Sequence, residues 1–313
     1  MQAPLLVADV PWLLYRGYFA LPKSIKGRDG RPVNALLGTV NALLSAIEAR
    51  PPRAVVACFG AEEARYRVEA YPPYHAHRDP MPEELREQWE RAPRLLADFG
   101  WITANAEELE ADDAMGSYAR VETEAGGRTL LLTADRDLYQ AVGDQVAVLD
   151  LGKRHVLELT ADDVIERYGI APERVPDFIA LRGDPSDGLP GAPGIGAKTA
   201  AALLQTYGTL EELLEQAERQ SEKTDSGGAN HDEASAKASR EQSPPTEAQL
   251  RPRVAATLHE NAELLRTFKQ IATLVEIDVS RPPDTPTDFA AGAAAVREIG
   301  MKRLAERLTT LSA

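Results

Sequence analysis

The sequence predicts an α/β protein with a mainly parallel sheet, followed by a smaller helical domain. In its first half, short apolar runs typical of buried strands alternate with longer runs of helical periodicity, which is the pattern of a parallel sheet flanked by helices. The apolar runs are LLVAD (5–9), AVVACF (54–59), TLLLTAD (129–135) and VAVLDL (146–151). From about Thr160 the periodicity is helical throughout, and several segments close with glycine. We therefore expect an α/β domain over residues 1–165 and a helical domain over residues 166–313.

The helical segments can be placed from their apolar periodicity. Two lie between the expected strands, NALLGTVNALLSAIEA (34–49) and PEELREQWERAPRLLADFG (82–100). The second half adds ADDVIERYG, PERVPDFIALRG, AKTAAALLQTYG and TLEELLEQAE, and the helical pattern resumes at VAATLHENAELLRTFKQIATL (254–274). Residues 219–249 contain almost no large apolar side chain. We expect a disordered insertion there, because such a segment cannot bury enough surface to become ordered.

Composition and charge narrow the class of protein. The chain has 313 residues, 43% of them hydrophobic, which is enough for a sizeable core. Its single cysteine, Cys58, excludes an intrachain disulfide and fits a reducing cytoplasm. The apolar N-terminus lacks a basic leader and is interrupted by Asp9 and Arg16, which argues against a signal peptide or membrane span. The net charge of −14, taken alone, argues against nucleic acid, since phosphate binding normally needs a basic surface.

Acidic residues gather in four places where chemistry is expected. One follows the first strand, EADDA begins a helix, TADRD follows a strand, and GDPSD follows a helix. Each alone has an ordinary explanation as a helix-dipole, capping or turn residue. Together they favour a metal site, because function collects at the carboxyl ends of parallel strands and clustered carboxylates repel unless cations neutralise them. The eight carboxylates are Asp9, Glu110, Asp112, Asp113, Asp135, Asp137, Asp184 and Asp187.

Oxygen ligands of this kind suit two or more Mg²⁺ or Mn²⁺ ions. Two such ions can hold the attacking water and the leaving oxygen of a phosphodiester. Zinc is disfavoured, because the histidines and Cys58 have no metal-ligand spacing. Bound ions would neutralise much of the negative charge and would themselves attract phosphate.

The glycine-rich stretch GAPGIGAKTA follows the last acidic group. It is not a P-loop, because Ala197 separates Gly196 from Lys198, and a dinucleotide fingerprint would need glycine where Thr199 stands. We therefore expect no nucleotide cofactor. We expect a tight turn between two helices, with the second helix starting near Ala197 and its backbone N–H groups and Lys198 gripping a phosphate. The alternative is an ordinary helix–helix turn.

Taken together, these motifs resemble the flap endonuclease / 5′-3′ exonuclease family, in particular the 5′-nuclease domain of bacterial DNA polymerase I and its stand-alone bacterial relatives. EADD, TADRDLYQ and GDPSDGLPGAPGIGAKTA occur in the family's order, VADVPWLLYRGYFALP resembles its first strand and helix, and YRVEAYPPYHAHR resembles the segment leading into its helical arch. The resemblance covers nearly the whole chain apart from the insertion. It implies a PIN-like nuclease core, a helical arch at about residues 60–95, and a C-terminal helix-hairpin-helix (H3TH) domain.

The resemblance also implies a function. The chain is expected to be a metal-dependent phosphodiesterase of DNA replication and repair, associated with the nucleoid and specific for structure rather than sequence, that cuts DNA with a 5′ end, nick or flap. The chain would act as a monomer away from membranes, with polymerase activity supplied by a separate protein. The eight carboxylates would hold the metal ions. The residues that would contact the scissile phosphate or the base next to it are Arg16, Arg67, Arg78, Tyr74 and His75. The downstream duplex would be held, often with K⁺ in this family, by Gly194, Gly196, Lys198 and Thr199.

Two positions depart from the family's pattern. Gly60 stands where the family usually has an aspartate after the second strand, so we expect Gly60→Asp to tighten metal use and raise the rate. His75 stands where a lysine usually follows the arch tyrosine, and histidine is only partly cationic at pH 7. These departures leave open a branch-specific DNA-binding protein with weak or no nuclease activity. A nuclease directed at RNA is a third alternative.

Overall fold

The computed structural model describes residues 3–152, 156–226 and 250–312. Its centre is one six-stranded sheet in the order β3-β2-β1-β4-β5-β6. The strands are β1 (Leu5–Asp9), β2 (Ala54–Phe59), β3 (Ile102–Asn105), β4 (Thr129–Leu132), β5 (Val146–Leu151) and β6 (Val156–Leu159). All neighbours pair in parallel except β6, which runs antiparallel to β5. The expected α/β class is confirmed. The strands β3 and β6 were not predicted. The predicted strand TLLLTAD ends at Leu132.

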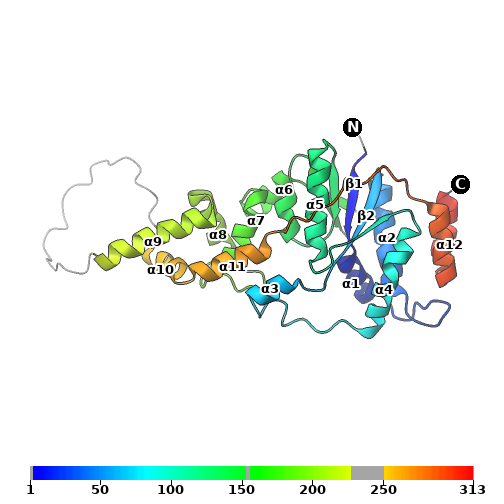
Figure 1. Ribbon diagram of the computed structural model, residues 1–313, viewed down its shortest axis with the longest axis horizontal. Helices are drawn as coiled ribbons and strands as arrows, with labels where there is room; N and C mark the ends of the chain where they lie inside the picture. Colours follow the sequence, from blue (N-terminus) through cyan, green and yellow to red (C-terminus); the bar gives the residue numbers. More distant parts are fainter. Residues whose placement is uncertain (1–2, 153–155, 227–249, 313) are drawn as a thin grey trace.

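Helices cover both faces of this sheet (Figure 1). Side chains alternate along β1, so that Leu6 and Ala8 join one hydrophobic cluster while Leu5 and Val7 join the other. The first cluster is covered by α1 (Val10–Ala20), α2 (Asn34–Ala49) and α4 (Glu83–Ala97). The second is covered by α5 (Ala111–Glu124) and a 3₁₀ helix, η1 (Asp137–Ala141). The expected arch segment contains the short helix α3 (Arg65–Ala70) and most of α4.

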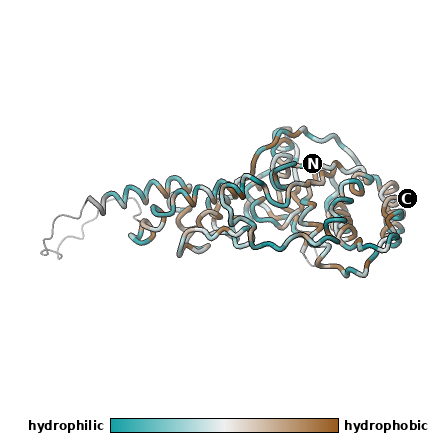
Figure 2. Tube along the Cα trace, turned by 60° about the horizontal axis from the view of Figure 1, so that its bottom comes forward, coloured by the Kyte–Doolittle hydropathy of each residue, from teal (hydrophilic) through white to brown (hydrophobic). Residues whose placement is uncertain are grey.

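The helical domain extends from one side of the sheet as an arm (Figure 1). Its elements are α6 (Ala161–Tyr168), η2 (Pro172–Arg174), α7 (Val175–Arg182), α8 (Ala197–Tyr207), α9 (Leu210–Ser226), α10 (Pro252–Glu260) and α11 (Ala262–Ala272). Hydrophilic residues predominate along the outer end of this arm (Figure 2). The predicted disordered insertion is wrong at its start, because residues 219–226 continue α9. The buried Leu213, Leu214 and Ala217 anchor this helix, and the polar helix formers that follow prolong it. Residues 227–249 lie outside the described residues.

After α11 the chain returns to the first domain. Residues 273–288, which we call the strap, run from α11 to α12 (Phe289–Ile299) and α13 (Lys302–Leu311) (Figure 1). The strap is fixed by the fully buried Glu122, which accepts hydrogen bonds from Arg281 at 3.0 Å and also pairs with Arg53. The helices α12 and α13, which the expected division grouped with the helical domain, share the hydrophobic cluster of α1, α2 and α4.

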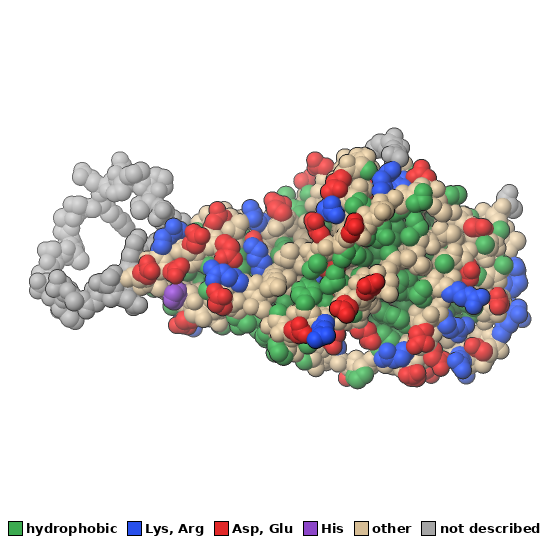
Figure 3. Space-filling view, in the orientation of Figure 1, with side chains coloured by type: hydrophobic (Ala, Val, Ile, Leu, Met, Phe, Trp, Pro, Cys, Tyr) green, Lys and Arg blue, Asp and Glu red, His purple; other side chains and the backbone are tan. Residues whose placement is uncertain are grey.

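The surface of the face seen in Figure 3 carries acidic and basic side chains interspersed over both the arm and the α12 end. Among the described helices, none combines the length and apolar character that a membrane crossing requires.

Candidate active site

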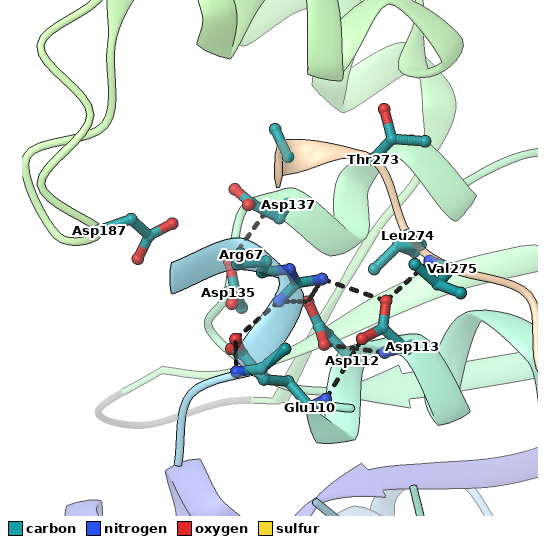
Figure 4. A network of polar contacts seen from close by, with 12 residues as sticks. Arg67, Glu110, Asp112, Asp113, Asp135, Asp137, Asp187, Thr273, Leu274 and Val275 are labelled. Atoms are coloured by element: carbon teal, nitrogen blue, oxygen red, sulfur yellow. Dashed lines mark hydrogen bonds and ion pairs between the residues drawn. The ribbon is translucent and has the colours of Figure 1, made fainter. Parts of the chain in front are cut away.

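The structure brings acidic segments together at the carboxyl ends of the strands. Asp9 closes β1, and the segment carrying Asp135 and Asp137 follows β4, which is the neighbour of β1. Glu110, Asp112 and Asp113 lie at the start of α5, which packs on these strands. Figure 4 shows these α5 carboxylates and those of Asp135, Asp137 and Asp187 facing a common region around Arg67.

The start of α5 is fixed by its own capping interactions. Glu110 and Asp113 form a capping box, in which the backbone N–H of Glu110 donates to Asp113 Oδ2 at 3.2 Å. Such reciprocal bonds satisfy backbone donors that the first helical turn leaves free. The acidic motif EADD is therefore a helix start as well as a set of carboxylates.

Gly60 packs directly against this helix start. A Cβ atom at Gly60 would lie 2.5 Å from the carbonyl oxygen of Leu109 and 2.6 Å from the carbonyl carbon of Glu110. The backbone N–H of Ala61 also donates to Leu109 O at 2.8 Å, which holds these two segments of the chain together. Our expectation that Gly60→Asp would improve metal use is therefore wrong, because any side chain here must displace the backbone that presents Glu110 and Asp112.

Arg67 is the internal counter-ion of the α5 carboxylates. Its side chain is buried, and its guanidinium nitrogens lie 3.0 Å from Glu110 Oε1, 3.2 Å from Asp112 Oδ2 and 3.1 Å from Asp113 Oδ1. The negative charges of these three residues raise the pKa of Arg67 against the opposing effect of its burial. The expected role of Arg67 as a clamp on the scissile phosphate does not fit this position, because its donors are already committed to carboxylates.

The carboxylates of Asp9, Asp135 and Asp137 form no ion pair with Arg67, and their pKa values are raised. Burial raises the pKa of Asp135 to about 8, with further increases from the nearby charges of Asp112 and Asp187. Burial raises the pKa of Asp9 to about 6, although hydrogen bonds from Trp12 and Thr133 oppose the shift. The pKa of Asp137 is raised well above its usual value by burial and then by Asp135. Buried carboxylates that repel one another are groups that a cation would stabilise.

The arch segment is docked on the loop that carries Asp187. His75 Nε2 lies 3.2 Å from Asp187 Oδ1, and the His75 backbone N–H donates to Asp187 O at 3.1 Å. His75 adopts a left-handed backbone with φ of 56°, which is uncommon outside glycine. Arg78 donates to Asp187 Oδ1 at 3.1 Å and to Ser186 O at 3.2 Å. Both side chains therefore approach the acidic cluster from the arch.

Tyr74 is placed differently from the sequence-based expectation, whereas Arg16 is exposed. Tyr74 is 3% exposed, its hydroxyl donates to Glu110 Oε1 at 3.1 Å, and its ring stacks on His75 with 3.8 Å between centroids. Stacking of Tyr74 on a DNA base is not possible in this conformation, because its ring faces are covered. Arg16 is exposed on α1, with its guanidinium carbon 5.9 Å from the centroid of the Trp12 ring.

The donor set fits hard divalent cations by its chemistry. It consists of carboxylate oxygens, which Mg²⁺ and Mn²⁺ prefer. In the part of the chain that the structure describes, no three Asp, Glu, His or Cys side chains converge closely enough to hold one ion. Arg67 pairs with the α5 carboxylates instead, and among the described residues it forms no ion pair with Asp9, Asp135, Asp137, Asp184 or Asp187.

The glycine-rich loop presents an exposed helix start. The helix α8 begins at Ala197 as predicted, with Gly196 as its N-cap. Gly194, Gly196, Lys198 and Thr199 are all exposed, and a Cβ at either glycine would meet no atom within 4 Å. A tight turn lies where it was predicted, since the backbone N–H of Ile195 donates to Ala192 O at 3.0 Å and Gly194 has a φ of 77°. The whole connection from α7 to α8 is longer than expected, because it spans residues 183–196 and also carries Asp184 and Asp187. Asp184 and Asp187 thus lie on the connection between α7 and α8 that leads into this exposed helix start.

Some supporting residues could not be foreseen from the sequence. Thr133 Oγ1 donates to Asp9 Oδ2 at 2.9 Å, and its place just before Asp135 in TLLLTAD was the only available signal. The backbone N–H of Val275 donates to Asp113 Oδ1 at 2.7 Å, and a main-chain donor leaves no trace in the sequence.

Comparison with known proteins agrees with this geometry. Residues 4–169 match the model of the 5′-3′ exonuclease N-terminal resolvase-like domain, and residues 170–291 match that of the 5′-3′ exonuclease C-terminal SAM fold. A 5′-3′ exonuclease of Mycobacterium tuberculosis is 36% identical over 237 residues, which covers 68% of this chain and 74% of that protein. The thermostable DNA polymerase I of Thermus thermophilus is 41% identical over 214 residues, covering 68% of this chain. This chain spans only 25% of the length of that polymerase.

Solved structures share the fold at low sequence identity. T5 5′-exonuclease with bound zinc ions has a TM-score of 0.60 and 17% identity, with 98% of this chain and 97% of that chain covered. The catalytic core of Rad2 in complex with DNA substrate has a TM-score of 0.62 and 13% identity, with 100% and 93% covered. The two family models together with the carboxylate-lined sheet edge show that the chain belongs to the 5′-3′ exonuclease family.

Proposed function

We propose that this chain is a metal-dependent nuclease that hydrolyses phosphodiester bonds in DNA with a 5′ end, nick or flap. The observation that carries the proposal is that carboxylates from α5, from the segment after β4 and from the connection between α7 and α8 face one region. That connection leads directly into the exposed start of α8. Family membership supports the same activity. The Rad2 core in complex with DNA substrate supports a DNA target, and T5 5′-exonuclease with zinc supports a divalent metal.

The carboxylates with which Arg67 does not pair, those of Asp9, Asp135, Asp137, Asp184 and Asp187, would hold Mg²⁺ or Mn²⁺. When bound, such ions activate a water and stabilise the leaving oxygen of a phosphodiester. Because the pKa of Asp135 is about 8, this carboxyl group must lose a proton before it can act as a ligand. Metal binding should therefore strengthen as the pH rises through this value.

The cationic side chains have separate tasks in this proposal. Arg78, which is half exposed beside Asp187, is placed to meet the scissile phosphate, and His75 holds the arch on the same loop. Arg16 is free to contact the DNA backbone from the exposed face of α1. Arg67 keeps the α5 carboxylates in place by pairing with them.

The start of α8 would grip a phosphate farther along the duplex. Backbone N–H groups at a helix N-terminus favour anions, and the exposed Lys198 adds a positive charge. We propose K⁺ as the monovalent ion at this turn, on the strength of the family resemblance alone. The chain would bind DNA as a monomer, which light scattering of the free protein and of its DNA complex can test.

A labelled 5′-flap duplex incubated with Mg²⁺ or Mn²⁺ tests the proposal. We expect the wild type to release the flap and Asp135→Asn to abolish release while still binding the duplex. Asp144→Asn is the matched control, because Asp144 is an exposed acid in the turn before β5. If the wild type leaves no product that Asp135→Asn removes, the chain is not a flap nuclease. An RNA flap in parallel distinguishes a DNA enzyme from an RNA enzyme.

A further inference from the structure

The point where the strap leaves α11 is fastened to the acidic segment of α5. The backbone N–H of Val275 donates to Asp113 Oδ1 at 2.7 Å, and that of Ile277 donates to Ser117 Oγ at 3.0 Å. Asp113 and Ser117 are one helical turn apart on α5, so two main-chain bonds run along one side of this helix. Figure 4 shows Leu274 and Val275 beside Asp113.

The same junction is fastened to the segment that carries Asp137. Gln140 Oε1 accepts a hydrogen bond from the Leu274 backbone N–H at 3.1 Å. Gln140 Nε2 donates to Ala272 O at 2.8 Å and to Asp137 O at 2.7 Å. One amide side chain thus joins η1 to the end of α11 and to the start of the strap.

The helix α11 also reaches the third acidic segment. It packs against α7, and Lys269 Nζ lies 2.7 Å from Asp177 Oδ1 of that helix. The connection that follows α7 carries Asp184 and Asp187. The end of α11 is therefore attached to α5 and η1 through the strap, and α11 packs on the helix that precedes the connection carrying Asp184 and Asp187.

Asp113 itself is saturated by protein donors. Its side chain is fully buried, with Oδ1 accepting from Val275 N–H and lying 3.1 Å from Arg67, and Oδ2 accepting from Glu110 N–H. A carboxylate whose two oxygens are both engaged by protein groups is placed to orient its neighbours. Asp113 is therefore a positioning residue, and the expectation that it holds a metal ion directly does not fit its contacts.

We propose that residues 272–277 act as a splint that sets the spacing between the carboxylates of α5 and those of η1, and so couples the helical domain to metal binding. The inference rests on the proposed function in one respect, namely that these carboxylates bind a divalent cation. Partners that orient metal ligands typically change metal affinity by about 10–100-fold when removed, so the splint has a measurable consequence for the ion itself.

The test uses three variants of the full chain. Val275→Pro removes the N–H that reaches Asp113, and Glu276→Pro places the same ring one residue along, where the N–H makes none of these bonds. Gln140→Ala removes the link to η1 without touching the main chain of the strap. Mn²⁺ binding is measured by electron paramagnetic resonance, melting temperature by circular dichroism, and flap-duplex affinity in EDTA by anisotropy.

We expect Val275→Pro and Gln140→Ala to weaken Mn²⁺ binding by about tenfold or more, with Glu276→Pro close to wild type and duplex affinity in EDTA unchanged for all. Mn²⁺ affinity within twofold of wild type in Gln140→Ala overturns the inference, even if Val275→Pro fails to fold. If the variants lose Mn²⁺ affinity but the wild type cleaves no flap, the nuclease proposal is refuted while the inference about residues 272–277 stands.

Discussion

Arg67 offers the sharpest test of how the acidic cluster is held together. Arg67→Met removes the charge that pairs with Glu110, Asp112 and Asp113 while keeping an apolar stem in a site that is only 2% exposed. Removing one partner of a buried ion pair costs about 3–5 kcal/mol, because the remaining charge is left without compensation. Three carboxylates share this guanidinium, so we expect the upper part of that range at pH 8 without metal.

The matched control is Arg65→Met. Arg65 lies two residues away on α3, and its ion pair with Glu69 is exposed, so we expect no measurable change. Unfolding in urea, followed by tryptophan fluorescence in EDTA, gives the free energy of unfolding for each variant. A loss for Arg67→Met no greater than for Arg65→Met at pH 8 would refute the counter-ion role.

The loss of stability caused by Arg67→Met should depend on pH and on metal, and Arg65→Met again serves as the control. The pKa of Asp113 is raised to about 7 by burial and then by Asp112. Below that pH this carboxyl group becomes neutral, so the penalty of Arg67→Met should shrink between pH 8 and pH 5.5. Mn²⁺ should stabilise Arg67→Met more than wild type, since the ion can replace the missing positive charge. An equal penalty at both pH values would contradict the assignment.

Three further outcomes follow from the site. Gly60→Ala should destabilise the protein by about 1–3 kcal/mol through overpacking at the start of α5 and weaken Mn²⁺ binding, whereas Gly143→Ala, with open space around its Cβ, should do neither. Because the folded-state pKa values of Asp135 and Asp9 are raised to about 8 and about 6 from 3.8, the folded chain binds more protons than the unfolded chain across that window. Stability in EDTA should therefore fall as the pH rises from about 4 to about 8, and Asp135→Asn should flatten the slope of melting temperature against pH. Lys198→Ala should weaken duplex binding equally for unrelated sequences and reduce the slope of log affinity against log salt by about 0.9; an unchanged slope would place Lys198 away from the phosphates.

The parts of the fold that the sequence predicted are those whose burial leaves a continuous apolar signal. The strands β1 and β2 lie inside the sheet, so nearly every residue is apolar whichever face it points to. The strand β3 was missed because it is four residues long and alternates between half-buried and exposed. The strand β6 was missed for the same reasons at the opposite edge of the sheet.

The acidic segments were predictable because each lies at the end of an element that the sequence itself marks. What the sequence could not show was which groups meet across long separations. Arg67 and Asp112 are 45 residues apart, and only the folded chain reveals that the arginine faces carboxylates. The burial of Tyr74 against Glu110 likewise depends on how the arch docks. The sequence placed residues 289–311 in an expected helical domain without indicating which surface α12 and α13 would cover.

The return of the chain through the strap has a consequence for biosynthesis. Val296, Leu304 and Leu308, which lie in α12 and α13, are buried in the same cluster as Leu13 and Leu43. A nascent chain makes α1 and α2 well before α12 and α13, so their apolar surface stays partly uncovered until these two helices have left the ribosome. Transiently exposed apolar surface of this kind favours aggregation. The order of synthesis thus runs against the order in which this half of the core can close, and slow elongation over the codons between α2 and α12 would prolong the vulnerable interval.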